Sequence, residues 1–387
     1  MAETLQKTLL ILTPLLFLAD LVQSLFYIRE RKAFYYTCFV AFFAAMMFAL
    51  LAASLPLMWV AVELTTLVSA PLIAHSRSRE SLEAMWKYLL ICSIGIGLAL
   101  FGTMLVLHAQ TTGNPMWYKV GFAFVLAGYG TKTGLAPFHT WLPDAHSEAP
   151  APVSALLSGA LLNCSFYAIV RFRAIMPQEV APFCDGAMTV LGLLSVAVAA
   201  VFMVRQADYK RLLAYSSVEH MGLNTLIFAL GPFQTILICH VCAHSLTKTM
   251  LFLTAGNLLH AFKTRSIAAV QGLGVSMKGH AALWICGLFL ICGMPPSVLF
   301  LTELGLVVNA PFWAAATVLA LLFIIFSAML RVGISMTMGR PTTRPAPLPG
   351  RLSVVPWTLL ALLVALGVAG SVHLLRTLQA GAPAVFS

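Results

Sequence analysis

Charged residues are scarce in this chain of 387 residues. Asp, Glu, Lys and Arg together make up 9% of it, whereas hydrophobic residues make up 60% and the mean hydropathy is +0.92. So little charge in so long a chain excludes a soluble globular domain and predicts a polytopic membrane protein. The 26 Gly and 20 Pro are too few for a disordered chain, and both residue types commonly pack or bend membrane helices.

Cofactor motifs are missing as well. No group of cysteines has the spacing of an iron–sulfur site, and neither a haem-attachment motif nor a nucleotide-binding loop occurs. Cys239 and Cys242 form a Cys-x-x-Cys pair with His240 and His244 nearby, and two interpretations are open. A metal or redox pair is one, but small residues facing neighbouring helices are the more common case. We therefore expect a protein without a cofactor or a metal.

Apolar runs long enough to cross a bilayer recur along the chain. They fall at residues 5–28, 34–54, 55–74, 86–107, 117–137, 150–172, 186–204, 212–230, 233–260, 280–310, 312–338 and 353–375. The first run lacks the small-residue cleavage site of a signal peptide. The sequence therefore predicts an all-α polytopic membrane protein with about twelve transmembrane helices, two of them interrupted.

The net charge of +10 is explained by topology and does not require a nucleic-acid partner. If the loops alternate between two sides, one side collects Arg29, Arg31, Lys32, Arg77, Arg79, Lys87, Arg205, Lys210, Arg211, Lys263, Arg265, Lys278, Arg340, Arg344 and Arg351. The other side holds Lys7, Lys119, Arg171, Arg173 and Arg376. Because cytoplasmic loops carry an excess of Lys and Arg, we expect the first side to be cytoplasmic. Both termini would then lie on the outer side of a bacterial inner membrane.

Ionisable residues within the spans, and the helix breaks, recur five spans apart. Glu63 in the third span and Lys132 in the fifth are matched by Glu219 in the eighth and Glu303 in the tenth. The fifth and tenth spans are broken at Gly134–Pro137 and Gly293–Pro296. An offset of five spans inverts the second unit relative to the first, which is a common plan among transporters.

The repeat divides the chain into four parts. Residues 1–33 form an N-terminal helix, and residues 34–173 form the first five-helix repeat. Residues 186–338 form the inverted second repeat with its own discontinuous helix, and residues 339–387 hold a C-terminal helix.

Lys132 is the most informative residue of the sequence, because it is a cation in an apolar segment that then breaks. A charge at membrane depth is costly and usually marks an ion or proton path. Irregular backbone beside it is tolerated only where it is packed in protein or faces water. Burial favours the neutral amine, whereas a nearby carboxylate such as Glu63 favours the ammonium. The pair predicts a switchable proton carrier, and a static ion pair that locks two helices is the alternative.

A path through the second half is predicted from the remaining buried groups. His244 and Lys248 are four residues apart and lie on one helical face. With buried water to bridge the gaps, the predicted proton path consists of Glu63, Lys132, Glu219, His220, His244, Lys248 and Glu303. Asp20 has either a packing or an interfacial role, and His240 and His260 are predicted to be structural.

The segment after the first break adds four polar groups on the cytoplasmic side. His139, Asp144, His146 and Glu148 predict a vestibule where protons are taken up. A solvated polar loop is the alternative interpretation.

Several motifs resemble those of a known family. The stretch "GYGTKTGLAPFHTWLPDAHSEAPAPVSALLSGALLNCSFYAIVRF" from Gly128 to Phe172 is similar to the signature of antiporter-like subunits. These subunits occur in respiratory complex I, multisubunit sodium/proton antiporters and membrane-bound NiFe hydrogenases. Three further matches are "WVAVELTTLVSAPLIA" (Trp59 to Ala74), "DYKRLLAYSSVEHMGL" (Asp208 to Leu223) and "HSLTKTMLFLTAGNLLH" (His244 to His260).

The resemblance implies two inverted five-helix units with discontinuous helices. It also implies that Glu63 and Lys132 are the family's Glu–Lys pair and that Glu303 is its terminal acid. The family's central Lys, on its long broken region, would correspond to Lys248, with His244 beside it. These residues would form the proposed proton path, coupled to redox chemistry in partner subunits.

Three departures from the family pattern bear on function. The chain is shorter than a typical member by about two N-terminal helices. Asn163 occupies the position at which complex I members often carry a Lys, so a link between Lys132 and Lys248 needs water or other groups. Glu219 and His220 form a Glu–His pair that is similar to the hydrogenase-type members.

The favoured hypothesis is a proton-translocating, non-redox membrane subunit of a membrane-bound NiFe hydrogenase or formate-hydrogenlyase-like complex. Its partners would be other membrane subunits, a peripheral redox arm with Fe–S subunits, and the lipid bilayer. The alternatives are a subunit of a complex I-type quinone oxidoreductase, a cation/proton antiporter or an inorganic-carbon uptake system. A scaffold that does not pump is an alternative of a different class.

Overall fold

The structure is a computed structural model that describes residues 1–231, 234–341 and 344–379, with side chains described up to His373. The last part of the predicted C-terminal segment, residues 380–387, and the side chain of Arg376 therefore lie outside the described residues.

Helices make up nearly all of the described chain, because an apolar segment in a bilayer must satisfy its backbone hydrogen bonds internally. The long ones are α1 (Ala2–Tyr27), α2 (Lys32–Leu51), α3 (Leu55–Ile73), α4 (Arg79–Thr112), α5 (Pro115–Thr133), α9 (Ala181–Val204), α10 (Tyr209–Leu230), α11 (Gln234–Phe262), α15 (Phe312–Thr337) and α16 (Val354–Gln379). The shorter elements are η1 (Ala74–Ser76), η2 (Phe138–Thr140), α6 (Trp141–Glu148), α7 (Ala151–Leu156), η3 (Leu157–Leu161), α8 (Leu162–Ala174), α12 (Leu273–Ser276), α13 (Lys278–Ile291), α14 (Val298–Asn309) and η4 (Gly350–Ser353).

The predicted class, an all-α polytopic membrane protein, is confirmed. Within the described ranges, nine helical segments are long and apolar enough to cross a membrane. The helices α5 and α10 have a similar length but carry more polar residues, and α13 and α14 form one broken crossing. Together these elements account for the twelve predicted crossings.

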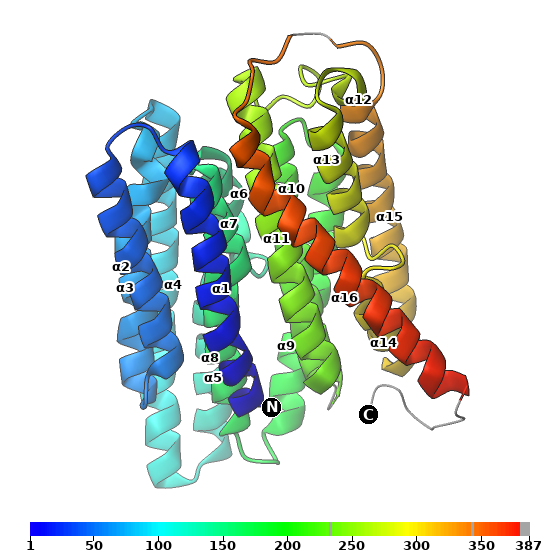
Figure 1. Cartoon of the computed structure of the whole chain (residues 1–387). Coiled ribbons are helices and arrows are strands. Elements are labelled where there is room, and N and C mark those ends of the chain that lie inside the picture. Colours follow the sequence, from blue (N-terminus) through cyan, green and yellow to red (C-terminus); the bar gives the residue numbers. More distant parts are fainter. Residues whose placement is uncertain (232–233, 342–343, 380–387) are drawn as a thin grey trace.

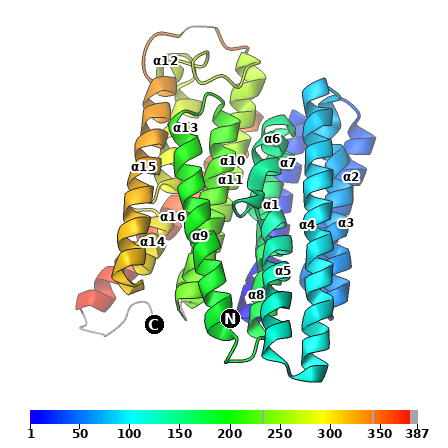
Figure 2. The ribbon, with the colours of Figure 1, turned by 180° about the vertical axis from the view of Figure 1, so that it is seen from behind.

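The helices pack as one bundle around two central crossings (Figures 1 and 2). Every residue of an 18-residue apolar window in Ala151–Ala174 is buried within the protein, as are 83% of the residues in such a window in Gln234–Phe262, so these two segments form the middle of the bundle. Helix α1 lies beside α2, α7 and α11, and α16 runs diagonally across α11, α13 and α14 (Figure 1).

The first helix break, after α5, is a Schellman turn. Gly134 has φ +82°, a left-handed conformation that favours glycine. Its N–H donates to the carbonyl oxygen of Thr131 (3.2 Å), and the N–H of Leu135 donates to that of Gly130 (2.8 Å). The turn satisfies the last carbonyls of α5 and ends the helix at Thr133, one residue after Lys132.

The second break, after α13, has the same hydrogen-bond pattern. Gly293 has φ +61°, and its N–H donates to the carbonyl oxygen of Leu290 (3.3 Å). The N–H of Met294 donates to the carbonyl oxygen of Phe289 (3.0 Å). The two turns therefore share one design, although the exact bounds of the two repeats stay a prediction.

The prediction of a broken region around Lys248 is wrong. Lys248 lies in the middle of α11, a continuous helix of 29 residues, and not on a broken region. The reason is local, because Gln234–Phe262 contains no Pro and its single glycine, Gly256, stays helical.

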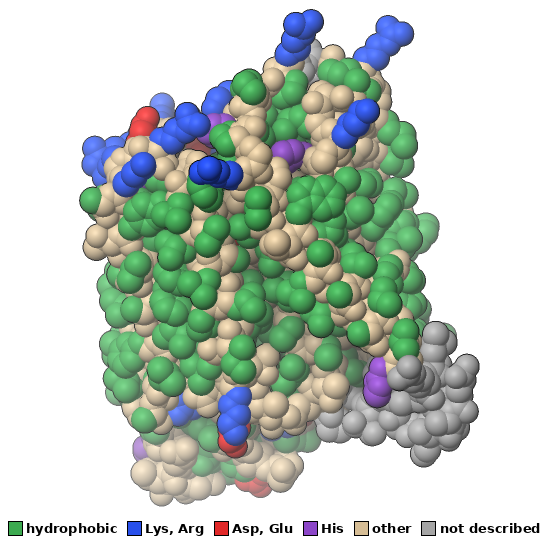
Figure 3. Space-filling view, in the orientation of Figure 1, with side chains coloured by type: hydrophobic (Ala, Val, Ile, Leu, Met, Phe, Trp, Pro, Cys, Tyr) green, Lys and Arg blue, Asp and Glu red, His purple; other side chains and the backbone are tan. Residues whose placement is uncertain are grey.

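A broad apolar belt crosses the middle of the bundle on the face shown in Figure 3. Most Lys and Arg side chains visible on this face gather at the end that carries α12 and its loops, whereas the N-terminus lies at the opposite end (Figures 1 and 3). The charge asymmetry predicted from the sequence is thus visible along the bundle axis on this face.

Candidate functional site

Lys132 lies at the meeting point of α3, α4 and α5 and is fully buried. Its ammonium donates to the hydroxyl of Thr66 at 2.9 Å and makes a short contact to that of Tyr88. It also lies 4.4 Å from the centre of the Tyr88 ring, which provides a cation–π contact. Tyr88 in turn pairs with Ser69 at 2.7 Å. The buried ammonium is therefore held by neutral hydroxyl groups and an aromatic ring.

Glu63 does not form a direct ion pair with Lys132 in the described structure. One carboxylate oxygen accepts a hydrogen bond from Ser93 at 2.8 Å. The other is buried and has no hydrogen-bond partner among the described residues. Glu63 and Thr66 are three residues apart on one face of α3, so the acid lies one turn from the hydroxyl that Lys132 contacts. A proton shared between Glu63 and Lys132 needs water or a side-chain movement.

Lys248 occupies the corresponding interior position in the second half. It is fully buried on α11, and its ammonium donates to the carbonyl oxygen of Leu213 on α10 at 2.7 Å. Glu219, which is 2% exposed on α10, acts on it electrostatically without a direct ion pair in the described part of the chain. The acid–ammonium arrangement of the first half therefore recurs, again with a gap between the charges.

Three histidines continue this polar interior, and all three are fully buried. The Nδ1 of His220 lies 3.1 Å from the Nε2 of His240, and the His220 Nε2 lies 3.0 Å from the carbonyl oxygen of Ile291. The rings of His220 and His244 are 5.0 Å apart. Neither nitrogen of His244 has a hydrogen-bond partner in the described ranges. Imidazole nitrogens both donate and accept, so this stack can pass a proton.

His240 lies within hydrogen-bonding distance of groups on two other helices. Its Nδ1 is 2.9 Å from the Thr302 hydroxyl, one residue before Glu303 on α14. His240, predicted to be structural, thus connects α10, α11 and α14. The signal was its spacing, because His240, His244 and Lys248 follow one another at four-residue intervals on one helical face.

Glu303 is 8% exposed and lies against the second helix break. An ideal Cβ placed on Gly293 would lie 2.2 Å from a Glu303 carboxylate oxygen, so the acid packs directly on this glycine. Its other carboxylate oxygen has no hydrogen-bond partner among the residues that the structure describes. The position of the Glu303 carboxylate therefore depends on the backbone of the second helix break.

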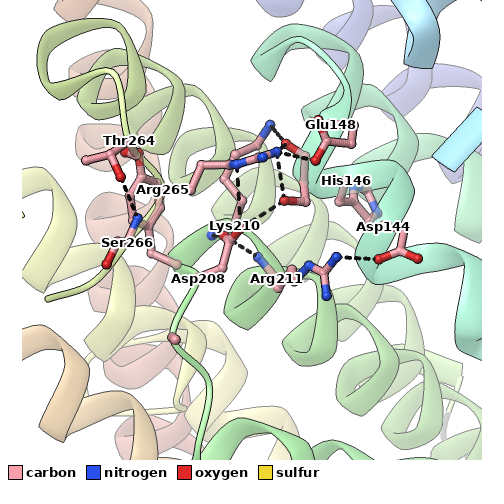
Figure 4. A network of polar contacts seen from close by, with 12 residues as sticks. Asp144, His146, Glu148, Asp208, Lys210, Arg211, Thr264, Arg265 and Ser266 are labelled. Carbon is pink, nitrogen blue, oxygen red and sulfur yellow. Dashed lines mark hydrogen bonds and ion pairs between the residues drawn. The ribbon is translucent and has the colours of Figure 1, made fainter. Parts of the chain in front are cut away.

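Two acids of the predicted uptake vestibule are held in ion pairs (Figure 4). Asp144 lies 2.6 Å from Arg211 on α10 and 3.1 Å from Lys87 on α4. Glu148 lies 2.5 Å from Arg265 in the loop after α11. These pairs fasten α6 to the rest of the bundle, and a role in proton uptake stays a prediction.

A buried lysine completes this network (Figure 4). The fully buried Lys210 donates to the carbonyl oxygens of Ser147 at 3.0 Å and Ala149 at 2.7 Å. Both carbonyls lie at the C-terminal end of α6, where such groups lack helical partners. A lysine at this place satisfies them and complements the helix dipole.

The two histidines of the vestibule are buried. His139 is 6% exposed beside the rings of Phe202 and Tyr215. His146 is fully buried, stacked on Phe252 at 4.8 Å, and neither of its nitrogens is hydrogen-bonded within the described residues. Of the four residues of the predicted vestibule, the two acids are therefore in ion pairs and the two histidines are buried.

Asn163 lies between the two halves of the chain. Its amide nitrogen donates to the hydroxyl of Ser245 on α11 and to the carbonyl oxygen of Gly159, both at 2.8 Å. The π-helical turn η3 ends two residues before Asn163, and such turns are frequent at functional sites. A neutral side chain thus connects α8 and α11 at the position where complex I members often carry a Lys.

The described residues contain no group of three or more His, Cys, Asp or Glu side chains arranged to hold a metal ion. Cys239 and Cys242 are free thiols that line an apolar pocket of about 330 Å³ between α11, α14 and α16.

A profile of the NADH:quinone oxidoreductase/Mrp antiporter transmembrane family matches residues 52–331. The chain belongs to this family, which confirms the resemblance seen in its motifs, and it is an antiporter-like, multi-span integral membrane subunit.

Three similar proteins illustrate which members of the family the chain resembles. A hydrogenase-4 component F homolog of Methylacidiphilum infernorum is 36% identical, with 81% of this chain and 72% of the relative covered. An uncharacterized protein of Mycobacterium tuberculosis is 32% identical over 68% of this chain and 44% of the relative. NAD(P)H-quinone oxidoreductase chain 4 of Prochlorococcus marinus is 33% identical over 51% of this chain and 37% of the relative. The chain spans less than half the length of the latter two.

Three solved structures share the fold. A chain of respiratory complex I from Thermus thermophilus matches with a TM-score of 0.81 and 24% identity, covering 94% of this chain and 83% of that one. A chain of the archaeal membrane-bound sulfane sulfur reductase gives 0.82 and 24%, covering 90% and 75%. A chain of the Mrp complex from Dietzia gives 0.85 and 22%, covering 96% and 81%. All three belong to complexes of several subunits.

Proposed function

We propose that this protein is the proton-translocating membrane subunit of a membrane-bound NiFe hydrogenase or formate-hydrogenlyase-like complex. Protons would move along the buried chain of Glu63, Lys132, Glu219, His220, His244, Lys248 and Glu303. Electron transfer in partner subunits would drive them. The 36% identity to a hydrogenase-4 component F homolog supports the choice of complex.

One observation carries the proposal. Lys132 and Lys248 are both fully buried at interior positions of the two halves, and neither ammonium has a carboxylate within ion-pairing distance among the described residues. An unpaired charge so deep in a membrane protein is costly. An ammonium held by hydroxyl and carbonyl oxygens, with an acid a short distance away, is suited to losing and regaining a proton.

The orientation follows from the charge distribution. We infer that the end of the bundle rich in Lys and Arg faces the cytoplasm of a bacterial cell, with the N-terminus on the outer side of the inner membrane. Asp144 and Glu148 would then lie next to cytoplasmic water, with the buried imidazoles of His139 and His146 behind them. Partners would be other membrane subunits and a peripheral hydrogenase arm with Fe–S subunits.

The test is a pair of substitutions on α5. Lys132→Ala should lower proton translocation by about a hundredfold or more, because it removes a proton-transferring group. Lys119→Ala makes the same chemical change nearer the N-terminal end of α5 and should leave translocation intact. Proton uptake by inverted membrane vesicles is measured with a fluorescent dye, together with electron transfer and recovery of the assembled complex. Translocation by Lys132→Ala at the normal proton-to-electron ratio would refute the proposed path.

A second candidate is a subunit of a quinone oxidoreductase, which the similarity to NAD(P)H-quinone oxidoreductase chain 4 favours. Purification of the tagged chain in mild detergent separates the two. Nickel and iron with a hydrogenase-like large subunit support the first proposal, and a quinone-reducing arm without nickel supports the second. Recovery without a redox partner would instead support a cation/proton antiporter or an inorganic-carbon uptake system.

A scaffold without proton transfer makes the opposite prediction for Lys132→Ala. In that case the substitution alters the stability of the complex and leaves its proton-to-electron ratio unchanged. The same vesicle experiment therefore separates these two classes of function.

A further inference from the structure

Asp20 is the buried acid that the proposed path does not use. It lies in α1 and is fully buried, and neither of its carboxylate oxygens has a hydrogen-bond partner among the described residues. A carboxylate in this state is strongly disfavoured by the loss of hydration. An acid in such a place takes up a proton or is bridged by water.

A line of polar groups connects Asp20 to the end of the bundle that is rich in Lys and Arg. The hydroxyl of Ser24, one turn further along α1, pairs with the hydroxyl of Tyr35 on α2 at 2.9 Å. Because the Ser24 hydroxyl also donates to the Asp20 carbonyl oxygen at 2.7 Å, Tyr35 is the donor in this pair. Tyr35 in turn acts electrostatically on Asp20 and is therefore close to it.

The line continues to the protein surface at His75. The ring of His75, in η1, lies 5.4 Å from that of Tyr35 in an edge-on arrangement. His75 is half-buried, and its Nδ1 is unpartnered in the described structure. Its neighbours are Arg31 and Glu30 in the loop between α1 and α2. Asp20 is seven residues from the end of α1, which corresponds to about 10 Å along the helix.

On its other side, α1 contacts the middle of the bundle. Leu16, one turn before Asp20, packs where Gly159 of η3 meets the hydroxyl of Thr249 on α11. Tyr27, two turns after Asp20, packs against Gly256 of the same helix. Asp20 therefore lies at the level of α11 between Thr249 and Gly256.

Unpartnered polar atoms gather at this level. The hydroxyl of Thr249 and the amide oxygen of Asn163 have no hydrogen-bond partner in the described ranges. Lys248 precedes Thr249, and Phe252, one turn later, carries the stacked ring of His146. Buried water typically makes two to four hydrogen bonds to such groups. It would connect α1 with the Lys248 region.

We propose that Asp20 is a proton-binding site that is loaded through Ser24 and Tyr35 from the side of His75. The site supplies protons to the Lys248 half of the path, and in this respect it rests on the proposed function. It accounts for Asn163, because a second half with its own supply does not need a titratable group between Lys132 and Lys248. The Ser24 hydroxyl, which donates to the backbone carbonyl of Asp20 here, turns to the Asp20 carboxylate to deliver the proton. Ser24 and Tyr35 each accept one proton and donate one at the same hydroxyl, so no net charge is left on either.

The groups packed against α1 are consistent with this role. Tyr35 on α2 is the titratable neighbour of Asp20, and Tyr35 in turn has Tyr27 of α1 and Tyr36 of α2 near it. His244 and Lys248 are the titratable groups on the interior part of α11. Arg351 lies over Phe26 at the end of α1. None of these is in an ion pair with Asp20 among the described residues.

The closing experiment combines spectroscopy with transport in the purified complex. Infrared difference spectra of wild type against Asp20→Asn should show the carbonyl stretch of a protonated carboxyl, and this band should shift in D₂O. Thr13→Val is the matched control, because Thr13 is a buried and unpartnered hydroxyl on the same helix. It should leave the band unchanged. Tyr35→Phe should slow the D₂O shift by about tenfold, because it removes the relay hydroxyl.

Transport in vesicles separates a failure of this proposal from a failure of the proposed function. Asp20→Asn should reduce proton uptake by about tenfold or more, with recovery in Asp20→Glu. Normal transport in Asp20→Asn, in a complex whose wild type pumps and whose Lys132→Ala variant does not, would overturn the Asp20 site alone. A wild-type complex that does not pump would overturn the proposed function. In that case the infrared band and its D₂O shift still decide whether Asp20 binds an exchangeable proton.

Discussion

The contact between Gly293 and Glu303 allows a sharp test of the terminal acid. An Ala Cβ at position 293 would lie 2.2 Å from a Glu303 carboxylate oxygen and 2.8 Å from its carboxyl carbon. Real Cβ contacts essentially never fall below 3.0 Å, so the carboxylate oxygen must move by roughly 1 Å. Gly293→Ala therefore displaces a proton-carrying group while leaving its chemistry intact.

Two effects of this substitution have to be separated. The left-handed conformation of Gly293 costs an Ala residue about 1–2 kcal/mol of stability, whatever its surroundings. Gly113, which ends α4, has a similar φ of +67° with no atom within 4 Å of its ideal Cβ. Gly113→Ala is thus the matched control, with the backbone strain and without the displaced acid. We expect both variants to lose a similar amount of stability in thermal unfolding in detergent.

Transport is expected to distinguish the two variants. A misplacement of 1 Å in a reacting group can lower its rate by about a hundredfold, so Gly293→Ala should lose about ten- to a hundredfold in proton uptake. Gly113→Ala should retain normal uptake, and Glu303→Gln should match Gly293→Ala. Equal transport by Gly293→Ala and Gly113→Ala, with similar stability, would refute the role of Glu303 and its contact with the break.

Two further predictions concern the segment after the first break. Asp144→Ala removes the ion pairs to Lys87 and Arg211 and should destabilise the protein by about 1 kcal/mol, since both basic side chains are nearly half exposed. Thermal unfolding at low and high salt checks this, and a difference that does not shrink at high salt would contradict it. His146→Leu should keep or raise stability, because an apolar side chain replaces an unpartnered imidazole on Phe252. It should nevertheless slow proton uptake, and a fully active variant would remove His146 from the vestibule.

Much of the fold was predictable because membrane helices are specified locally. A run of about 20 apolar residues is long enough to cross a bilayer whatever its neighbours are, so the crossings followed from hydropathy. The two breaks followed from Gly and Pro, and both glycines adopt the left-handed conformation that the turn requires. The expected broken region around Lys248 failed for the same reason, because its segment has no Pro to interrupt the helix.

The partners of the buried groups were less predictable. The sequence predicted that Glu63 and Lys132 need each other or water, but it did not predict that Thr66 and Tyr88 are the direct contacts of Lys132. Hydroxyl groups are common in membrane helices, so nothing in the sequence marked Tyr88 as the contact. The burial of both Asp20 carboxylate oxygens was not predictable either, because it depends on how α1 packs against other helices, among them α2, α7 and α11.

The sequence by itself determined the membrane class, the crossings, the two matched breaks and the set of titratable residues inside the bilayer. These properties depend on hydropathy and backbone conformation over a few adjacent residues. The tertiary structure alone decided which of the buried groups meet. His220 contacts His240 across 20 residues of chain, Lys132 contacts Thr66 across 66, and Asp144 contacts Arg211 across 67. Such pairs are set by the packing of whole helices, which local sequence patterns do not encode.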